Sequence, residues 1–138
     1  MKRATGYSKR SLADKLGIKP GSRVSFSNPP GHYFALLGVS RGEIEIAASR
    51  ARELDFLQVF VRDRKQLAAS FPLAKQRIKA TGVLWVSWPK LSSTLAGNLS
   101  ENIVREIGLA NGLVDVKVAA IDEDWSGLKF VYRLRDRS

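Results

Sequence analysis

The stretch that most constrains the fold is 82–90, which has the sequence Gly-Val-Leu-Trp-Val-Ser-Trp-Pro-Lys. Four of the five residues from Val83 are apolar, and the run stops at a proline, which predicts a buried strand that ends at a loop. Helical patterns flank this strand, the first closed by Thr81-Gly82 and the second beginning at Ser100. A strand between two helices is the unit of a parallel α/β sheet, in which ligands bind just beyond the carboxyl ends of the strands.

The N-terminal half predicts alternating helices and strands. Ser11 and Asp14 have the spacing of a capping box, and Gly17 is a typical helix end, so a short helix is expected between them. A type II turn at 19–22 leads into a strand around Val24 and Phe26, and a helix is expected at 32–37. Further strands are expected at 43–47, where polar and apolar residues alternate, and at 54–61, with a turn of helix at 49–53 between them.

The C-terminal half predicts two helical regions and a hairpin. Asp63 is expected to cap a helix that Pro72 breaks, and a second helix would follow through Ile78. Another helix is expected from Ser100 to Gly112. Strands at 114–121 and 128–134, joined by a turn at 122–127, are close enough in sequence to pair antiparallel. The predicted fold class is therefore α/β, with a mostly parallel sheet of about six strands, a C-terminal antiparallel hairpin and helices on both faces.

Composition and charge bound the possible roles. The chain has 138 residues, 44% of them apolar, no cysteine and a net charge of +10, so disulfide scaffolds and thiolate metal sites are excluded. Without a long apolar segment, a cytoplasmic location is expected. Residues 1–23 hold seven basic residues against one acidic residue, and residues 129–138 hold four against one. We expect 1–10 to be a flexible basic tail, and 11–138 to form one domain.

The element order resembles the Rossmann-like fold of S-adenosylmethionine-dependent methyltransferases, with one strand-helix unit missing after the second strand. The chain is also similar to a small bacterial family, domain of unknown function thirty fifty-two. The stretches that carry this second resemblance are 6–8 (Gly-Tyr-Ser), 15–21 (Lys-Leu-Gly-Ile-Lys-Pro-Gly), 84–90, 112–118 (Gly-Leu-Val-Asp-Val-Lys-Val) and 125–129 (Trp-Ser-Gly-Leu-Lys), with Leu12 and Asp122. This resemblance implies a fold and no established activity.

The segment that would cradle the methyltransferase cofactor departs from the pattern of that fold. Such enzymes use an acidic, glycine-rich turn after the first strand, because glycine lets the backbone approach the ligand closely. Here the turn is 27–32, Ser-Asn-Pro-Pro-Gly-His, with one glycine, two prolines and no carboxylate. At the end of the second strand, where an acid would hold the ribose, stand Ala47, Ala48 and Ser49. S-adenosylmethionine is therefore a possible but disfavoured cofactor.

Three loops are expected to meet at one rim of the sheet and to form a pocket. Trp88 and Trp125 would supply a flat apolar wall with polar groups beside it, or else both indoles would cap the core. The candidate ligand-binding residues are Ser27, Asn28, Gly31, His32, Ser87, Trp88, Lys90, Asp122, Trp125 and Ser126. The favoured function is a non-catalytic binding protein for an unknown small molecule or protein partner. We therefore assign no catalytic residue.

Hydrolysis, metal binding and nucleic-acid binding are the alternatives to a binding protein of this kind. His32 is the only histidine, and a hydrolase would need it to meet Asp122 and either Ser27 or Ser87, but no nucleophile-elbow motif is present. The acidic residues at 122–124 could offer oxygen ligands, but turns attract such residues anyway, so no metal site is assigned. Sequence-tolerant nucleic-acid binding through the basic ends remains an alternative. Its residues would be Lys2, Arg3, Lys9, Arg10, Arg133, Arg135 and Arg137.

Overall fold

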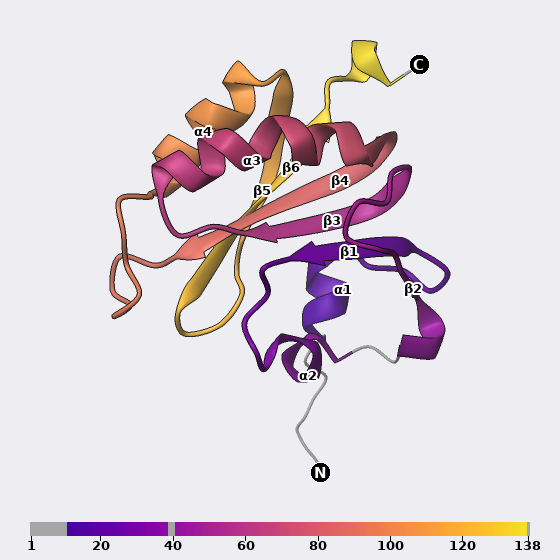
Figure 1. Cartoon of the computed structure of the whole chain (residues 1–138), viewed down its shortest axis with the longest axis horizontal. Helices are drawn as coiled ribbons and strands as arrows, with labels where there is room; N and C mark the ends of the chain where they lie inside the picture. The colour runs from indigo at the N-terminus through magenta and orange to yellow at the C-terminus, as the bar shows by residue number, and fades with distance from the viewer. Residues whose placement is uncertain (1–10, 39–40, 138) are drawn as a thin grey trace.

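A six-stranded sheet in the order β2-β1-β3-β4-β6-β5 forms the centre of the protein (Figure 1). The computed structural model describes residues 11–38 and 41–137. Neighbouring strands from β2 through β4 are parallel, whereas β6 is antiparallel to both β4 and β5. This arrangement confirms the predicted sheet with its terminal hairpin. The strands are β1 Arg23–Ser27, β2 Glu45–Ile46, β3 Leu54–Phe60, β4 Ile78–Pro89, β5 Leu113–Ala120 and β6 Trp125–Tyr132.

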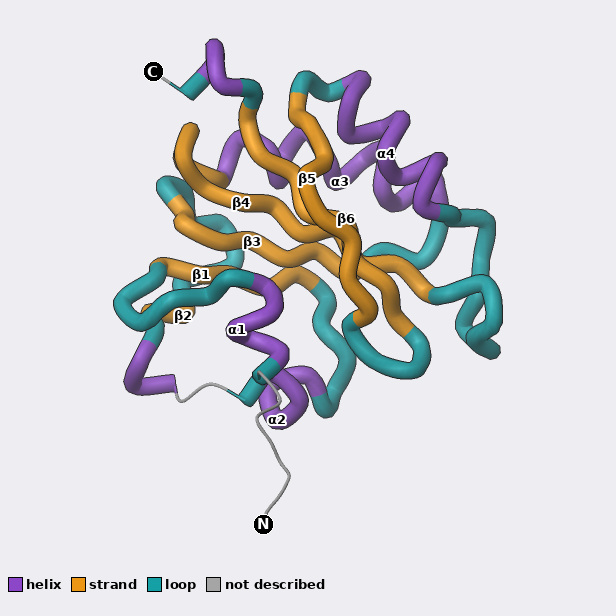
Figure 2. Tube along the Cα trace, turned by 180° about the vertical axis from the view of Figure 1, so that it is seen from behind, coloured by secondary structure: helices purple, strands orange, loops and turns teal. Residues whose placement is uncertain are grey.

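Helices cover both faces of the sheet, as predicted (Figures 1 and 2). The short helices α1 (Leu12–Leu16) and α2 (Tyr33–Leu37) lie on one face. The longer α3 (Arg64–Arg77) and α4 (Glu101–Ala110) lie on the other. Two short 3-10 helices, Arg41–Glu43 and Leu134–Asp136, complete the described elements.

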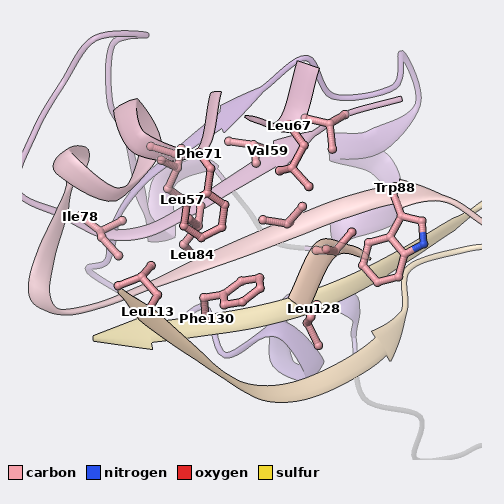
Figure 3. Packing of buried hydrophobic residues seen from close by; sticks show 14 of the residues in the cluster. Leu57, Val59, Leu67, Phe71, Ile78, Leu84, Trp88, Leu113, Leu128 and Phe130 are labelled. Atoms are coloured by element: carbon pink, nitrogen blue, oxygen red, sulfur yellow. The ribbon is translucent and has the colours of Figure 1, made fainter. Parts of the chain in front are cut away.

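Strand alternation divides the apolar residues into two cores. Leu57 and Val59 of β3 point toward α3 and α4, whereas Phe56 and Phe60 of the same strand point toward α1 and α2. Figure 3 shows the first core, in which side chains of α3 interdigitate with those of the central strands and Phe71 packs edge-to-face on Phe130. In the second core Trp85 is fully buried, and its indole N–H donates to the Leu16 carbonyl at 2.9 Å. Burial of both strand faces explains why most residues of β3 and of the 83–88 part of β4 are apolar.

The predicted helix starts and turns are confirmed by hydrogen bonds. The side chains of Ser11, Asp63 and Ser100 accept from the backbone N–H three residues later, at 3.1, 2.8 and 3.4 Å respectively. Gly17 ends α1 with φ of +85°, a conformation that costs glycine little. Gly21 has φ of +82° in the predicted turn after α1. These features depend on neighbouring residues in the sequence, which is why the sequence predicts them.

Three predicted boundaries between 47 and 82 are wrong. Pro72 does not break the helix, because α3 runs through it, with Pro72 on the exposed side while Leu67, Phe71 and Ala74 stay buried. Ile78 begins β4 and does not continue a helix. The turn of helix expected at 49–53 is instead an irregular crossover that joins β2 to β3.

The terminal hairpin is tighter than predicted. Strand β6 begins at Trp125 instead of Leu128, so the turn shortens to 121–124. Strand β5 forms an open edge of the sheet, and there Val116 and Val118 are half exposed on either side of Lys117. Trp125 at the start of β6 pairs with Pro89 at the end of β4. The hairpin turn therefore lies at the same end of the sheet as the carboxyl end of β4.

Within the described residues the two basic segments meet at the end of α1, where Nζ of Lys129 lies beside Gly17, but the rest of the C-terminal segment lies elsewhere. The 3-10 helix Leu134–Asp136 lies at the opposite end of the molecule from α1 (Figures 1 and 2). The predicted tail at 1–10 lies outside the described residues. Among the described helices, none combines the length and the apolar character that a membrane crossing requires.

Candidate ligand-binding site at the strand ends

A cavity of about 290 Å³ lies beyond the carboxyl ends of β1 and β3. The chain passes from β1 to β2 on one side and then crosses to β3 on the other side, so the strand order reverses between β1 and β3. Ligands of open α/β sheets bind at such a switch point. Four segments line the cavity, namely the turn after β1 (Asn28, Pro29, Pro30, His32), the end of β3 with the start of α3 (Phe60, Arg62, Gln66), Leu95, and the hairpin turn (Asp124, Trp125).

The turn after β1 is built by one left-handed residue and two prolines. Asn28 has φ of +57°, a conformation that asparagine tolerates better than most residues with side chains. Pro29 and Pro30 follow, and the Pro30 carbonyl accepts from the Tyr33 N–H at 3.0 Å to begin α2. Because proline has no backbone N–H, this turn presents fewer donors to a ligand than a glycine-rich turn does.

Asp122 fixes the hairpin turn and holds His32 against it. One carboxylate oxygen accepts the backbone N–H groups of Asp124 and Trp125, both at 2.8 Å. The other oxygen lies 3.2 Å from Nε2 of His32. Burial raises the pKa of Asp122, but the hydrogen bonds from Asp124, His32 and Trp125 together outweigh it, so the pKa lies below its ordinary value. An ionised Asp122 thus joins the turn after β1 to the hairpin.

Aromatic rings form the floor of the cavity. Trp125 packs edge-to-face on Phe60, with ring centroids 5.2 Å apart, and Phe60 packs in the same way on Tyr33 at 4.8 Å. Beneath them, the Tyr33 hydroxyl donates to the Gln58 side-chain oxygen, and the Gln58 amide donates to the Ser87 hydroxyl at 2.9 Å. Burial raises the pKa of Tyr33 above its ordinary value. This buried chain fixes the floor and stays neutral.

The loop after β4 packs against the start of α3 and closes one side. A Cβ on Gly97 would lie 2.5 Å from the Arg62 carbonyl oxygen, so this approach requires glycine. The Arg64 N–H donates to the Asn98 side chain at 2.8 Å. On the other side of the loop, the Ser93 hydroxyl donates to the Asp124 carboxylate, also at 2.8 Å. These contacts place Leu95 at the cavity.

The predicted wall of two tryptophans is wrong. Trp88 is 4% exposed and packs in the core beneath α3 and α4 (Figure 3), whereas Trp125 is 5% exposed and packs on the opposite face of the sheet. The register explains this, because Trp88 lies opposite Ser126 and Trp125 opposite Pro89, one position apart. Both indoles are buried in the core, in agreement with the alternative interpretation, and of the two only Trp125 also lines the cavity.

The other predicted pocket residues divide into three groups. Asn28, His32 and Trp125 line the cavity, and Asp122 contacts His32 beside it. Ser27 lines a separate groove on the α3 face, while Gly31, Lys90 and Ser126 do not line the cavity. Ser87 is fully buried and bound to Gln58, so it cannot join His32 and Asp122 in a hydrolase triad. Whether any of these residues binds a ligand stays a prediction.

Sequence reasoning missed Phe60, Arg62, Gln66 and Leu95. Phe60 ends a strand that the sequence predicts at 54–61, and Asp63 is a predicted helix cap just beyond it. The carboxyl end of a parallel strand shares the rim with its neighbours, so residues 60–66 could have been assigned to the site. Leu95 belongs to an irregular loop, and no sequence signal marked it.

The described residues do not fit S-adenosylmethionine in the manner of its usual sites. Pro29 and Pro30 remove two backbone donors from the turn after β1. The carboxyl end of β2 is followed by alanines and Ser49, without a carboxylate for the ribose hydroxyls. Glu45 does not substitute, because its carboxylate lies 3.4 Å from the Arg23 guanidinium, at the first residue of β1. Within 11–38 and 41–137, no three histidine or acidic side chains are grouped to hold a metal ion.

Comparison with solved structures relates the fold to methyltransferases. The magnesium protoporphyrin IX methyltransferase of Synechocystis PCC 6803 with bound SAM is 14% identical, with a TM-score of 0.62, over 89% of this chain and 77% of that one. The Methanococcus jannaschii fibrillarin pre-rRNA processing protein is 14% identical, with a TM-score of 0.55, over 88% and 73%.

An O-methyltransferase family 2 protein from Planctomyces limnophilus DSM 3776 is 16% identical, with a TM-score of 0.62, over 89% of this chain and 56% of that one. No family model matches the chain, and no curated protein matches it. At such identities the likeness concerns architecture and carries no activity with it. The chain therefore has the Rossmann-like α/β fold of S-adenosylmethionine-dependent methyltransferases.

Proposed function

We propose that the protein binds a small organic ligand in the cavity between β1 and β3 and does not transfer methyl groups. The observation that carries this proposal is the turn at 27–32, which keeps a cavity at the switch point but replaces the glycine-rich cradle with Pro29 and Pro30. A ring on the Phe60–Trp125 floor, with polar groups toward Arg62 and Gln66, suits the lining of the cavity. We further propose membership of the family of unknown function named above.

A cavity-filling variant tests the proposal. Leu95→Trp places an indole in the cavity, and Leu91→Trp is its matched control, since Leu91 is 72% exposed in the same loop and does not line the cavity. We expect native mass spectrometry of freshly purified protein to show a small-molecule adduct on the wild type and on Leu91→Trp, but not on Leu95→Trp. An adduct of equal occupancy on Leu95→Trp, or none on any of the three, contradicts the proposal.

A second candidate is a methyltransferase relative that binds S-adenosylmethionine. Its support is the shared fold, including the solved neighbour that holds this cofactor. Calorimetry with S-adenosylmethionine and S-adenosylhomocysteine separates the two candidates. Binding with a dissociation constant below about 1 mM that Leu95→Trp abolishes and Leu91→Trp keeps would favour the enzyme. No heat at that concentration favours the first proposal.

Nucleic-acid binding through the basic ends stays a separate prediction. Of its residues the structure describes Arg133, Arg135 and Arg137, and Arg135 lies near Asp136 at 3.9 Å. Mobility shifts on mixed DNA and RNA at two salt concentrations test this prediction. Deletion of residues 1–10 should weaken any such binding, and an unchanged shift would count against the role of the tail.

A further inference from the structure

A second hollow, separate from the cavity above, lies on the α3 face of the sheet. It has a volume of about 730 Å³ and runs between α3 and the crossover at 47–53. The crossover contains no helix, so β1 lacks a helical cover on this side. The side chains of β1 match this difference, because Val24 and Phe26 face the core under α1 and α2 while Ser25 faces Arg77 of α3. We call this hollow the arginine groove.

The arginine groove is strongly cationic. Its lining includes Arg50, Arg52 and Arg77 and contains no aspartate or glutamate. In the described chain, none of the three arginines forms an ion pair with a carboxylate. Three guanidinium groups around one hollow repel one another, and an anion among them would remove this cost.

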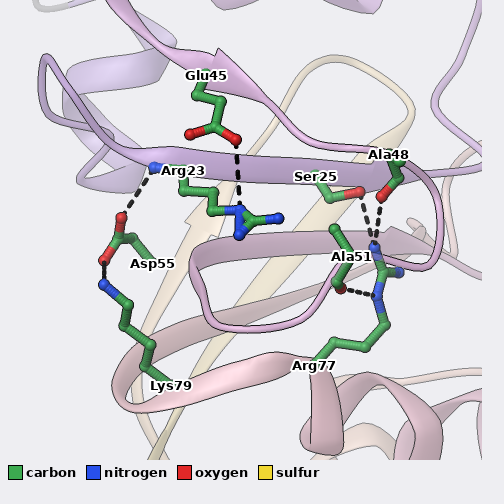
Figure 4. Close-up of polar contacts among 8 residues, drawn as sticks. All are labelled: Arg23, Ser25, Glu45, Ala48, Ala51, Asp55, Arg77 and Lys79. Carbon is green, nitrogen blue, oxygen red and sulfur yellow. Dashed lines mark hydrogen bonds and ion pairs between the residues drawn. The ribbon is translucent and has the colours of Figure 1, made fainter.

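Arg77 shows the imbalance most clearly (Figure 4). Its Nε donates to the Ala51 carbonyl at 2.9 Å, and one terminal nitrogen lies 3.0 Å from the Ser25 hydroxyl and 3.4 Å from the Ala48 carbonyl. All of these acceptors are neutral. Burial lowers the pKa of Arg77, as expected for a partly buried charge without a counterion. By contrast, Figure 4 also shows Arg23 at the start of β1 and Lys79 of β4, and each of these contacts a carboxylate.

The floor of the arginine groove is apolar. Val59 and Ala74 are buried beneath it, and Leu73 of α3 lines it although its side chain is 65% exposed. Exposed leucine inside a hollow is a surface on which a ring can stack or pack. Ser27 and Ser49 also line the groove. The groove thus combines an apolar patch with cations and neutral polar groups.

The lining of the groove indicates the chemistry of its ligand. Guanidinium groups match the geometry of phosphate oxygens and can bind them in pairs, and three of them, without a carboxylate partner among the described residues, line this hollow. The apolar patch around Leu73 lies in the same hollow, beside these cations. We infer that the arginine groove binds a small ligand made of a ring and a phosphate, with nucleoside monophosphates as the matching class. Arg50, Arg52 and Arg77 would contact the phosphate, and Leu73 would contact the ring.

Calorimetry of the full chain with AMP, adenosine and inorganic phosphate tests this inference. We expect AMP to bind at least about tenfold more tightly than adenosine or phosphate alone, since both parts of the site then contribute. Arg50→Ala/Arg52→Ala should weaken AMP at least about tenfold, and both side chains are exposed, so folding should be unaffected. Lys15→Ala/Lys19→Ala removes the same charge near α1, across the sheet, and should leave AMP binding within about twofold.

Leu73→Ser separates ring binding from phosphate binding, because it should weaken AMP and leave phosphate unchanged. The inference is overturned if AMP does not bind at about 5 mM, if adenosine binds as tightly as AMP, or if the two double variants weaken AMP equally. A single-stranded oligonucleotide that binds more tightly than AMP, with the lysine variant as impaired as the arginine variant, would also overturn it. None of these results concerns Leu95, so failure here is distinct from failure of the proposed function.

Discussion

Replacing Asp122 by alanine tests how the hairpin turn holds the cavity together. The variant loses two hydrogen bonds from backbone N–H groups at 2.8 Å and one contact with His32 at 3.2 Å. Hydrogen bonds to charged groups contribute about 1.5–3 kcal/mol each, although two that share one oxygen are not additive. The His32 side chain is 62% exposed, so its contact contributes less than about 1 kcal/mol. We expect a loss of about 3 kcal/mol in the free energy of unfolding.

The Asp122→Asn variant isolates the charge, because an amide oxygen can still accept both backbone donors. We expect it to lose about 1 kcal/mol near neutral pH. The pKa of Asp122 is lowered in the folded state, so its charge contributes stability above the unfolded pKa of about 3.9, and that contribution is lost as the pH falls through the folded pKa. The difference between wild type and Asp122→Asn should therefore be full near neutrality and should close in acid.

Urea unfolding followed by circular dichroism, at pH values from about 7 down to about 3, measures both differences. Glu123→Ala is the control, since this neighbouring side chain is exposed and should change stability by less than about 0.5 kcal/mol. The reasoning is refuted if Asp122→Ala costs less than about 1 kcal/mol, or if the gap between wild type and Asp122→Asn stays constant as the pH falls.

Three further substitutions test the packing. Gly108→Ala would drive a methyl group into the Phe130 ring and should lower the free energy of unfolding by about 1–3 kcal/mol in urea titrations; an unchanged midpoint would show that α4 can shift freely. Trp85→Phe loses the bond to Leu16 as well as volume and should cost about 2 kcal/mol, measured in the same way, and a neutral result would remove Trp85 as the anchor of α1. Pro72→Ala restores a backbone donor inside α3 and should raise the thermal midpoint by several degrees in calorimetry, whereas a lower midpoint would contradict this.

Much of the architecture was predictable because its signals are local. Ser11, Asp63 and Ser100 each bond a backbone group three residues away, and the alternation or continuity of apolar residues marks the strands. The predicted helix break at Pro72 is wrong because proline's low helix propensity is outweighed by the buried contacts of α3. The start of β4 at Ile78 depends on pairing with Leu54, a residue of another strand.

The location of the candidate site could be predicted from the sequence, but not the full set of side chains that line it. The topology brings the turns at 27–32 and 122–126 to one rim, as the strand order implies. Which face each indole occupies depends on the register between β4 and β6, and a shift of one residue exchanges the faces. The arginine groove depends on a crossover that contains no helix and on the side chain of Arg77 lying beneath it. No local pattern encodes such an arrangement.

The open edge at β5 has a consequence for self-association. Unpaired strand edges invite a second chain to continue the sheet, and the valines at 116 and 118 would favour such a contact. Lys117 lies between them, directly opposite Lys129 on the neighbouring strand. Two copies meeting edge to edge would therefore bring the lysines of both chains close together, which disfavours the contact, while Lys117 and Lys129 already repel each other within the hairpin.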